Sequence, residues 1–205
     1  MNIKGHNKGF TIIELIVAVA ILGMMISIIG SFQKDIFYLS SVARSSLLSA
    51  QDARNVVRVM AKEMRGMSQG NNGAYPLLQA ATSSVKFYSD TDSDGLREEI
   101  RYYISGSKLL RGSIKPTGSP ATTYTSSNEV VTTLVNDVRN GTSTPVFEYY
   151  DSSYAGTTTP MTYPVSLLSV RLIKASISVD ADPGRAPIQK IYTSQTALRN
   201  LKDNL

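Results

Sequence analysis

The fold of this chain is decided near its start, by the stretch Gly9-Phe10-Thr11-Ile12-Ile13-Glu14-Leu15-Ile16-Val17-Ala18-Val19-Ala20-Ile21-Leu22-Gly23. It opens an apolar run, Phe10 to Ile29, in which Glu14 is the only charged residue. About twenty residues of α-helix span ~30 Å, the thickness of the hydrocarbon core of a bilayer. The run therefore predicts a membrane-spanning helix over residues 10–30.

The flanking charges predict how this helix is oriented. Lys4 and Lys8 lie before the apolar run, and positive residues beside a span favour the cytoplasmic side. We expect a cytoplasmic N-terminus and a C-terminal domain in the periplasm or outside the cell. Glu14 lies inside the span, where a carboxylate costs roughly 2.5–3.5 kcal/mol on insertion scales, so it requires a partner.

The Gly-Phe-Thr-x-x-Glu pattern, followed by an apolar run, resembles the N-terminus of type IV pilins and type II secretion pseudopilins. The resemblance implies that a prepilin peptidase removes a leader, residues 1–9, by cutting after Gly9, and then methylates the amine of Phe10. It also implies that Glu14 meets the positive N-terminus of a neighbouring subunit during assembly. Two charges that are each costly in lipid stabilise one another when paired.

Two other interpretations of the N-terminus compete with this resemblance. A secretory signal peptide has an apolar core of about 7–15 residues and a small-residue cleavage site after it. The run here is longer and contains Glu14. An ordinary single-pass anchor explains the apolar run, but it explains neither the Gly9-Phe10 junction nor Glu14.

The helical pattern continues beyond the apolar run. Apolar and small residues recur at a spacing of three or four, which predicts an amphipathic continuation of the helix over residues 31–67. This stripe consists of Phe32, Ile36, Leu39, Ala43, Ser46, Ala50, Ala53, Val57, Met60, Met64 and Met67. Gly66 and the glycines at 70 and 73 mark the end of the helix.

After residue 74 the apolar period changes to two, which predicts strands. The predicted strands are 85–88, 99–104, 108–114, 146–150, 170–179 and 188–196, while 130–134 fits either a strand or a short helix. Residues 68–205 are thus expected to form a globular antiparallel β-sheet domain of roughly 135 residues. The predicted fold class is α+β: a long N-terminal helix, membrane-spanning in its first half, packed against an antiparallel sheet in the manner of pilins.

Composition argues against an enzyme. The chain has no Cys, and its one His, His6, lies in the expected leader, so thiol nucleophiles and His-based triads or metal clusters have no residues in the processed chain. Removal of Lys4 and Lys8 lowers the formal net charge from +5 to +3. That charge by itself does not indicate nucleic-acid binding, and we expect no specific nucleic acid partner.

An acidic turn is the one candidate metal site. Asp90, Asp92 and Asp94 precede Gly95 with the spacing that opens a calcium loop of the EF type. Glu99, or its neighbour Glu98, is a further candidate ligand, but the twelfth loop position, where a bidentate Glu belongs, is Arg101. The alternatives are a weak calcium site and a solvated hairpin turn.

Together these features predict a non-enzymatic pilin or pseudopilin subunit. Its expected partners are the prepilin peptidase, other subunits and the inner (cytoplasmic) membrane, before assembly into a filament. The Asp-rich turn and the segments at 145–151 and 193–200 resemble minor, J-type pseudopilins. A calcium-dependent adhesin or binding module on a pilin-like anchor is the alternative function.

Overall fold

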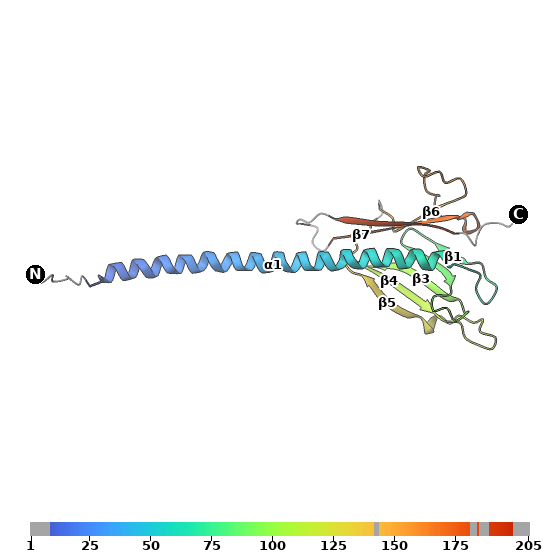
Figure 1. Cartoon of the computed structure of the whole chain (residues 1–205), viewed down its shortest axis with the longest axis horizontal. Helices are drawn as coiled ribbons and strands as arrows, with labels where there is room; N and C mark the ends of the chain where they lie inside the picture. Colours follow the sequence, from blue (N-terminus) through green and yellow to red (C-terminus); the bar gives the residue numbers. More distant parts are fainter. Residues whose placement is uncertain (1–8, 142–143, 181–183, 185–188, 199–205) are drawn as a thin grey trace, which may run out of the picture. The chain divides into compact units, whose positions relative to one another are not determined.

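The structure is a computed structural model that describes residues 9–141, 144–180, 184 and 189–198. It confirms the α+β class, with one long helix and antiparallel strands (Figure 1). The helix α1 runs from Ile12 to Arg65. The chain divides into two compact units, one before and one after the boundary between Arg44 and Ser45. The predicted leader lies outside the described residues except for Gly9.

The first unit, up to Arg44, contains the apolar half of α1. Every described residue from 9 to 41 is exposed to solvent, including large side chains such as Phe10 and Ile12, at 78% and 80%. The first members of the predicted stripe, Phe32, Ile36 and Leu39, are also exposed. The apolar surface of this unit therefore has no partner among the residues of the unit that the structure describes.

The second unit, from Ser45 on, contains two antiparallel sheets where the sequence predicted one. The five-stranded sheet has the order β1-β2-β3-β4-β5, and the three-stranded sheet has the order β6-β7-β8. The strands are β1 (Leu77–Ala80), β2 (Ser84–Ser89), β3 (Glu98–Ser105), β4 (Lys108–Ile114), β5 (Val130–Val135), β6 (Phe147–Tyr150), β7 (Leu172–Val179) and β8 (Lys190–Ala197). The segment at 130–134 is thus a strand, and β1 is an element that the sequence pattern did not predict.

One core joins the helix and both sheets. In Figure 1 the part of α1 that belongs to the second unit, from Ser45 to Arg65, lies between the two sheets. The predicted helix stripe is buried from Ala50 to Met67, where it meets alternate residues of the strands. Core residues include Ala53, Met60 and Met64 of α1, Phe87, Ile100 and Tyr102 of the larger sheet, and Phe147, Ile173 and Ile177 of the smaller sheet.

The segment between β5 and β6 links the two sheets. Val138 forms an isolated bridge with Val179 of β7, and the backbone N–H of Arg139 donates to the carbonyl of Ser178 at 2.8 Å. Asp137 accepts hydrogen bonds from Ser45 and Ser49 of α1 at 3.5 and 3.1 Å. This segment therefore fixes the ends of both sheets against the first buried turn of the helix.

Candidate functional site

The processing junction lies at the open start of the helix. Gly9 and Phe10 are exposed and precede the first helical residue, Ile12. A Cβ atom built on Gly9 meets nothing within 4 Å. The fold of the described chain therefore tolerates a side chain at Gly9, and any requirement for glycine there comes from an external factor such as a processing enzyme.

Glu14 also caps the start of the helix, a contact that the sequence analysis did not predict. The carbonyl of Thr11 accepts the first helical hydrogen bond, from Leu15, so Thr11 is the N-cap residue. Thr11 Oγ1 accepts from the backbone N–H of Glu14, and the Glu14 carboxylate accepts from the backbone N–H of Thr11, each at 3.4 Å. This is a capping box, and the Thr-x-x-Glu spacing was its signal.

The helix after this cap can cross a membrane. Among the described residues, α1 is the one helix that is long and apolar enough to do so by length and composition, and its most apolar window is not buried. A soluble core helix would bury this surface against its own domain. The helix is consistent with anchoring in the inner membrane.

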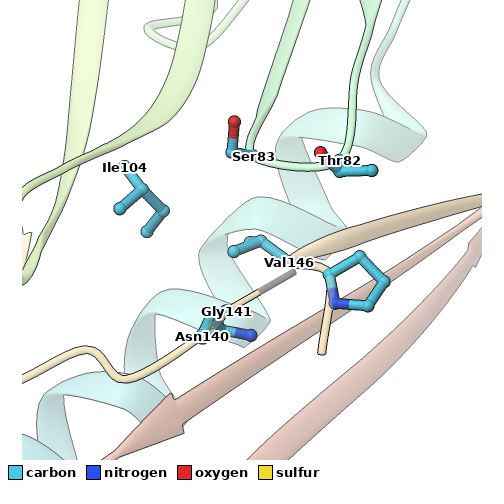
Figure 2. A pocket seen from close by; sticks show the side chains of 7 residues that line it. Thr82, Ser83, Ile104, Asn140, Gly141 and Val146 are labelled. Carbon is cyan, nitrogen blue, oxygen red and sulfur yellow. The ribbon is translucent and has the colours of Figure 1, made fainter. Parts of the chain in front are cut away.

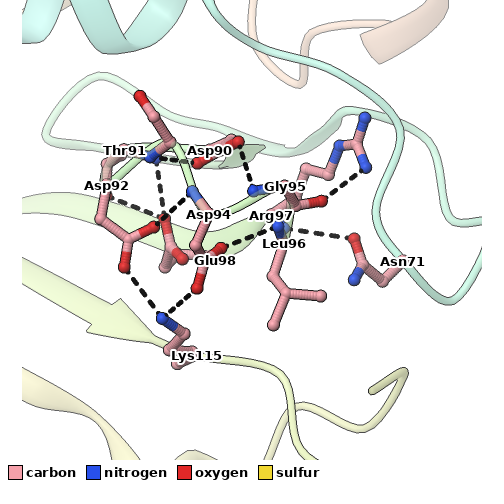
Figure 3. Close-up of polar contacts among 11 residues, drawn as sticks. Asn71, Asp90, Thr91, Asp92, Asp94, Gly95, Leu96, Arg97, Glu98 and Lys115 are labelled. Atoms are coloured by element: carbon pink, nitrogen blue, oxygen red, sulfur yellow. Dashed lines mark hydrogen bonds and ion pairs between the residues drawn. The ribbon is translucent and has the colours of Figure 1, made fainter. Parts of the chain in front are cut away.

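The acidic turn between β2 and β3 is the second candidate site (Figure 3). Asp90, Asp92 and Glu98 each place one carboxylate oxygen within 4.8 Å of the others. Asp90 accepts from the backbone N–H groups of Ser93 and Gly95 at 2.7 and 3.0 Å. The turn thus converges three carboxylates on one point, although Asp90 also stabilises the turn itself.

The structure separates the two neighbouring glutamates. Glu98 lies on the face of β3 shared by Ile100 and Tyr102 and is only 4% exposed. Glu99 lies on the opposite face, where its carboxylate is 2.8 Å from Lys86 of β2. Glu98 therefore joins the acidic group, whereas the predicted ligand Glu99 does not. The alternation of the strand, with its period of two, was the sequence signal that places Glu98 on the inner face.

Lys115 partly neutralises the turn. Its ammonium nitrogen lies 2.9 Å from Asp92 and also pairs with Asp94. The hydrogen bonds that Lys115 donates to Asp94 and then to Asp92 raise the pKa of Lys115, and the bond from Lys115 lowers the pKa of Asp94. Asp94 is thus turned toward Lys115, while Asp90, Asp92 and Glu98 remain together.

Three further titratable residues, Glu63, Tyr102 and Arg111, form a buried polar network at the helix. Tyr102 donates to Glu63 at 2.6 Å, and Arg111 contacts both carboxylate oxygens of Glu63 at 3.1 and 3.0 Å. Burial, followed by the charge of Glu63, raises the pKa of Tyr102. Tyr102 and Arg111 of the larger sheet thus both bind Glu63 of α1, so this network joins the helix to that sheet.

A small pocket lies between the two sheets (Figure 2). It has a volume of about 220 Å³ and is lined by Thr82, Ser83, Ile104, Asn140, Gly141, Pro145 and Val146. None of these side chains titrates. The amide of Asn140 donates to the carbonyls of Thr144 and Ser176 at 3.0 and 2.9 Å, so this side chain stabilises the linking segment.

The comparisons with known proteins bear on the N-terminus. The family described as the prokaryotic N-terminal methylation motif matches residues 4–30. Comparison with curated proteins gives no significant match. The matched segment contains the Gly9-Phe10 junction, Glu14 and the apolar run, and it does not reach the segments that resemble J-type proteins. The chain therefore carries a prepilin-type N-terminus, which supports a place for it in the type IV pilin and pseudopilin superfamily.

Proposed function

We propose that the chain is a non-enzymatic structural subunit of a type IV pilus or a type II secretion pseudopilus. A prepilin peptidase cuts between Gly9 and Phe10 and methylates the new amine, and the processed chain joins other subunits in a filament. The observation that carries the proposal is the methylation motif at residues 4–30, which includes the start of α1, a helix whose first thirty or so residues are exposed and largely apolar.

The exposed apolar surface supports assembly through the helix. Before assembly, lipid covers the apolar side chains of α1 up to Ile29. In a filament, the same side chains pack against helices of other subunits, so the surface stays out of water in both states. The paired charges of Glu14 and a neighbour's N-terminus then set the register between subunits, because each charge is costly in an apolar environment unless it is paired.

Orientation and place in the filament are further parts of the proposal. Lys4 and Lys8 support a cytoplasmic leader, with the unit from Ser45 on outside the inner membrane. The sequence segments similar to J-type pseudopilins, together with the polar loops at 116–127 and 151–164, support a minor subunit rather than a shaft subunit.

Filament incorporation tests the proposal. A tagged chain is expressed in a host with a complete assembly system, and filaments are sheared, purified and probed for the tag. We expect the tag in the filament fraction of a peptidase-competent host and its loss in a peptidase-deficient host. A chain that is processed and stays in the membrane, with an assembling pilin as positive control, would contradict the proposal.

The same experiment separates the rival function. The convergence of Asp90, Asp92 and Glu98 is the observation that favours a calcium-dependent binding module on a pilin-like anchor. Such a module would act from the membrane without joining a filament, so it would remain in the membrane fraction.

A further inference from the structure

We propose that the turn between β2 and β3 binds Ca²⁺ through Asp90, Asp92 and Glu98, with Lys115 as a built-in competitor for the same carboxylates. Of the set that the sequence pattern predicts, the site keeps Asp90 and Asp92, omits Asp94, and takes Glu98 rather than Glu99 as the further ligand. It lies within the second unit and is independent of filament assembly.

The distances among the carboxylates fit one cation. Calcium binds oxygen at 2.3–2.6 Å, so two ligands on opposite sides of the ion lie up to about 4.6–5.2 Å apart. One carboxylate oxygen from each of Asp90, Asp92 and Glu98 lies within 4.8 Å of the other two. One ion reaches all three without a rearrangement of the backbone.

Glu98 supplies the independent evidence for a ligand. Its Oε2 accepts hydrogen bonds from the backbone N–H and the hydroxyl of Thr91 at 2.9 and 2.8 Å. Its Oε1 is buried and has no hydrogen-bond partner among the residues that the structure describes. A buried carboxylate oxygen without a partner is costly and rare. The cation gives this oxygen a partner while Thr91 holds the other oxygen in place.

The charge balance around the turn also favours a cation. Asp90, Asp92, Asp94 and Glu98 lie within nine residues, and Lys115 is the basic side chain that pairs with them. Arg97 donates instead to the hydroxyl of Ser68 and the carbonyl of Gly95. Several negative charges therefore remain, and a divalent ion reduces their mutual repulsion.

Solvent can complete the coordination shell. Asp92, Glu98 and Lys115 border a groove of about 470 Å³, which is also lined by Thr91, Arg111 and Ser113. Calcium takes six to eight oxygen ligands. The three carboxylates supply part of that number, and water from the groove supplies the rest. With few protein ligands and a neighbouring ammonium, we expect a weak site, with a Kd of ~10⁻³ M, in the range of extracellular modules.

The test uses the full chain in non-ionic detergent, stripped with EDTA and dialysed. Binding is followed by tyrosine-sensitised Tb³⁺ luminescence with displacement by Ca²⁺, and by thermal melts with 10 mM CaCl₂ or 10 mM MgCl₂. For a Kd near 1 mM we expect CaCl₂ to raise the Tm by about 3–6 °C. MgCl₂ should have a clearly smaller effect, because Mg²⁺ requires shorter bonds and stricter octahedral geometry.

Two neighbouring variants form a matched pair. Glu98→Gln should weaken Ca²⁺ binding at least tenfold, because it replaces the buried carboxylate with a neutral amide. Glu99→Gln, one residue along on the opposite face, should leave the Kd unchanged. Lys115→Gln should strengthen binding about fivefold or more, since it removes a positive charge beside Asp92. Asp92→Asn replaces Glu98→Gln as the ligand variant if the latter fails to fold.

Three results would overturn the proposal. They are no saturable displacement of Tb³⁺ by Ca²⁺ up to 10 mM, an equal Tm shift with MgCl₂, or equal binding by wild type and the ligand variant. The first would leave Oε1 of Glu98 to water and the turn as an acidic hairpin.

Discussion

The proposed function gives Glu14 two roles, which one pair of substitutions separates. It closes the capping box with Thr11, and in the proposed filament its charge pairs with a neighbour's N-terminus. Glu14→Gln retains a side chain that can cap the helix but removes the charge, whereas Glu14→Ala removes both. Thr11→Ala removes the cap and keeps the charge, and so completes the set.

The two roles differ in the free energy that each contributes. The capping hydrogen bonds measure 3.4 Å, at the long end of the useful range. A loose cap of this kind contributes on the order of 0.5–1 kcal/mol, the lower part of the N-cap range. An unpaired charge in the apolar region costs roughly 2.5–3.5 kcal/mol, which corresponds to about 70- to 400-fold in an equilibrium.

Glu14→Gln should therefore affect membrane insertion and filament incorporation differently. The neutral side chain should enter the membrane at least as well as the wild type, and cleavage at Gly9 should continue. Incorporation into filaments should fall by at least tenfold, because the neighbour's amine loses its counter-charge. Thr11→Ala should assemble within about fivefold of wild type, since only the cap is lost.

The assay compares precursor, mature membrane-bound chain and sheared filament fraction for each variant by immunoblotting. If Glu14→Gln assembles like wild type while Glu14→Ala and Thr11→Ala both fail, the residue acts through the helix cap. The charge-pairing argument would then be refuted.

Three further predictions follow from the second unit. Tyr102 has a raised pKa, so the folded state keeps its proton above pH 10 where the unfolded state loses it. Stability should then fall as the pH rises beyond about 10, and denaturant unfolding of Tyr102→Phe should show a shallower decline. A Cβ on Gly112 would clash with the carboxylate of Glu129, which pairs with Arg101. Gly112→Ala should therefore lower the free energy of unfolding by up to about 1 kcal/mol, and this loss should vanish in a Glu129→Ala background. Residues 45–205, and also the longer fragment from residue 31, should fold as a soluble α+β domain, and a circular dichroism spectrum of helix alone or non-cooperative melting would contradict this.

Local sequence patterns were sufficient to predict most of the helix and strands of the second unit. The spacing of Ala53, Met60 and Met64 predicted the buried face of the helix, and these residues do lie in the core. The hairpin of β2 and β3 around the Asp-rich turn also followed from alternation. In both cases the residues that define the period are the residues that the core buries.

Features that depend on non-local pairing were not predictable in this way. β1 has four residues directly after Pro76 and no clean alternation, and it is a strand because it pairs with β2. The division into two sheets depends on which strands fail to pair, and no local period reports that. β5 is mostly exposed, so its period left helix and strand open.

In the candidate sites, too, some contacts had a local sequence signal and others depend on residues far apart in the chain. The Thr11-x-x-Glu14 cap and the inward position of Glu98 both had local signals, a spacing of three and a period of two. The pairing of Lys115 with Asp92 and Asp94 had none, because Lys115 reaches the turn from the end of β4. Likewise Arg111, which pairs with Glu63, lies 48 residues away from it in the chain.

Mass spectrometry of the N-terminus tests the central claim most directly. The chain is extracted from the membranes of a host with an active prepilin peptidase, and its N-terminal peptide is sequenced. The account predicts a chain that begins at Phe10 and carries one methyl group on its α-amine. Gly9→Ala should accumulate as precursor with an unchanged melting temperature, because a Cβ built on Gly9 meets no atom of the described chain within 4 Å beyond its chain neighbours. An intact Met1 leader, or a cut at any other position, would contradict the account.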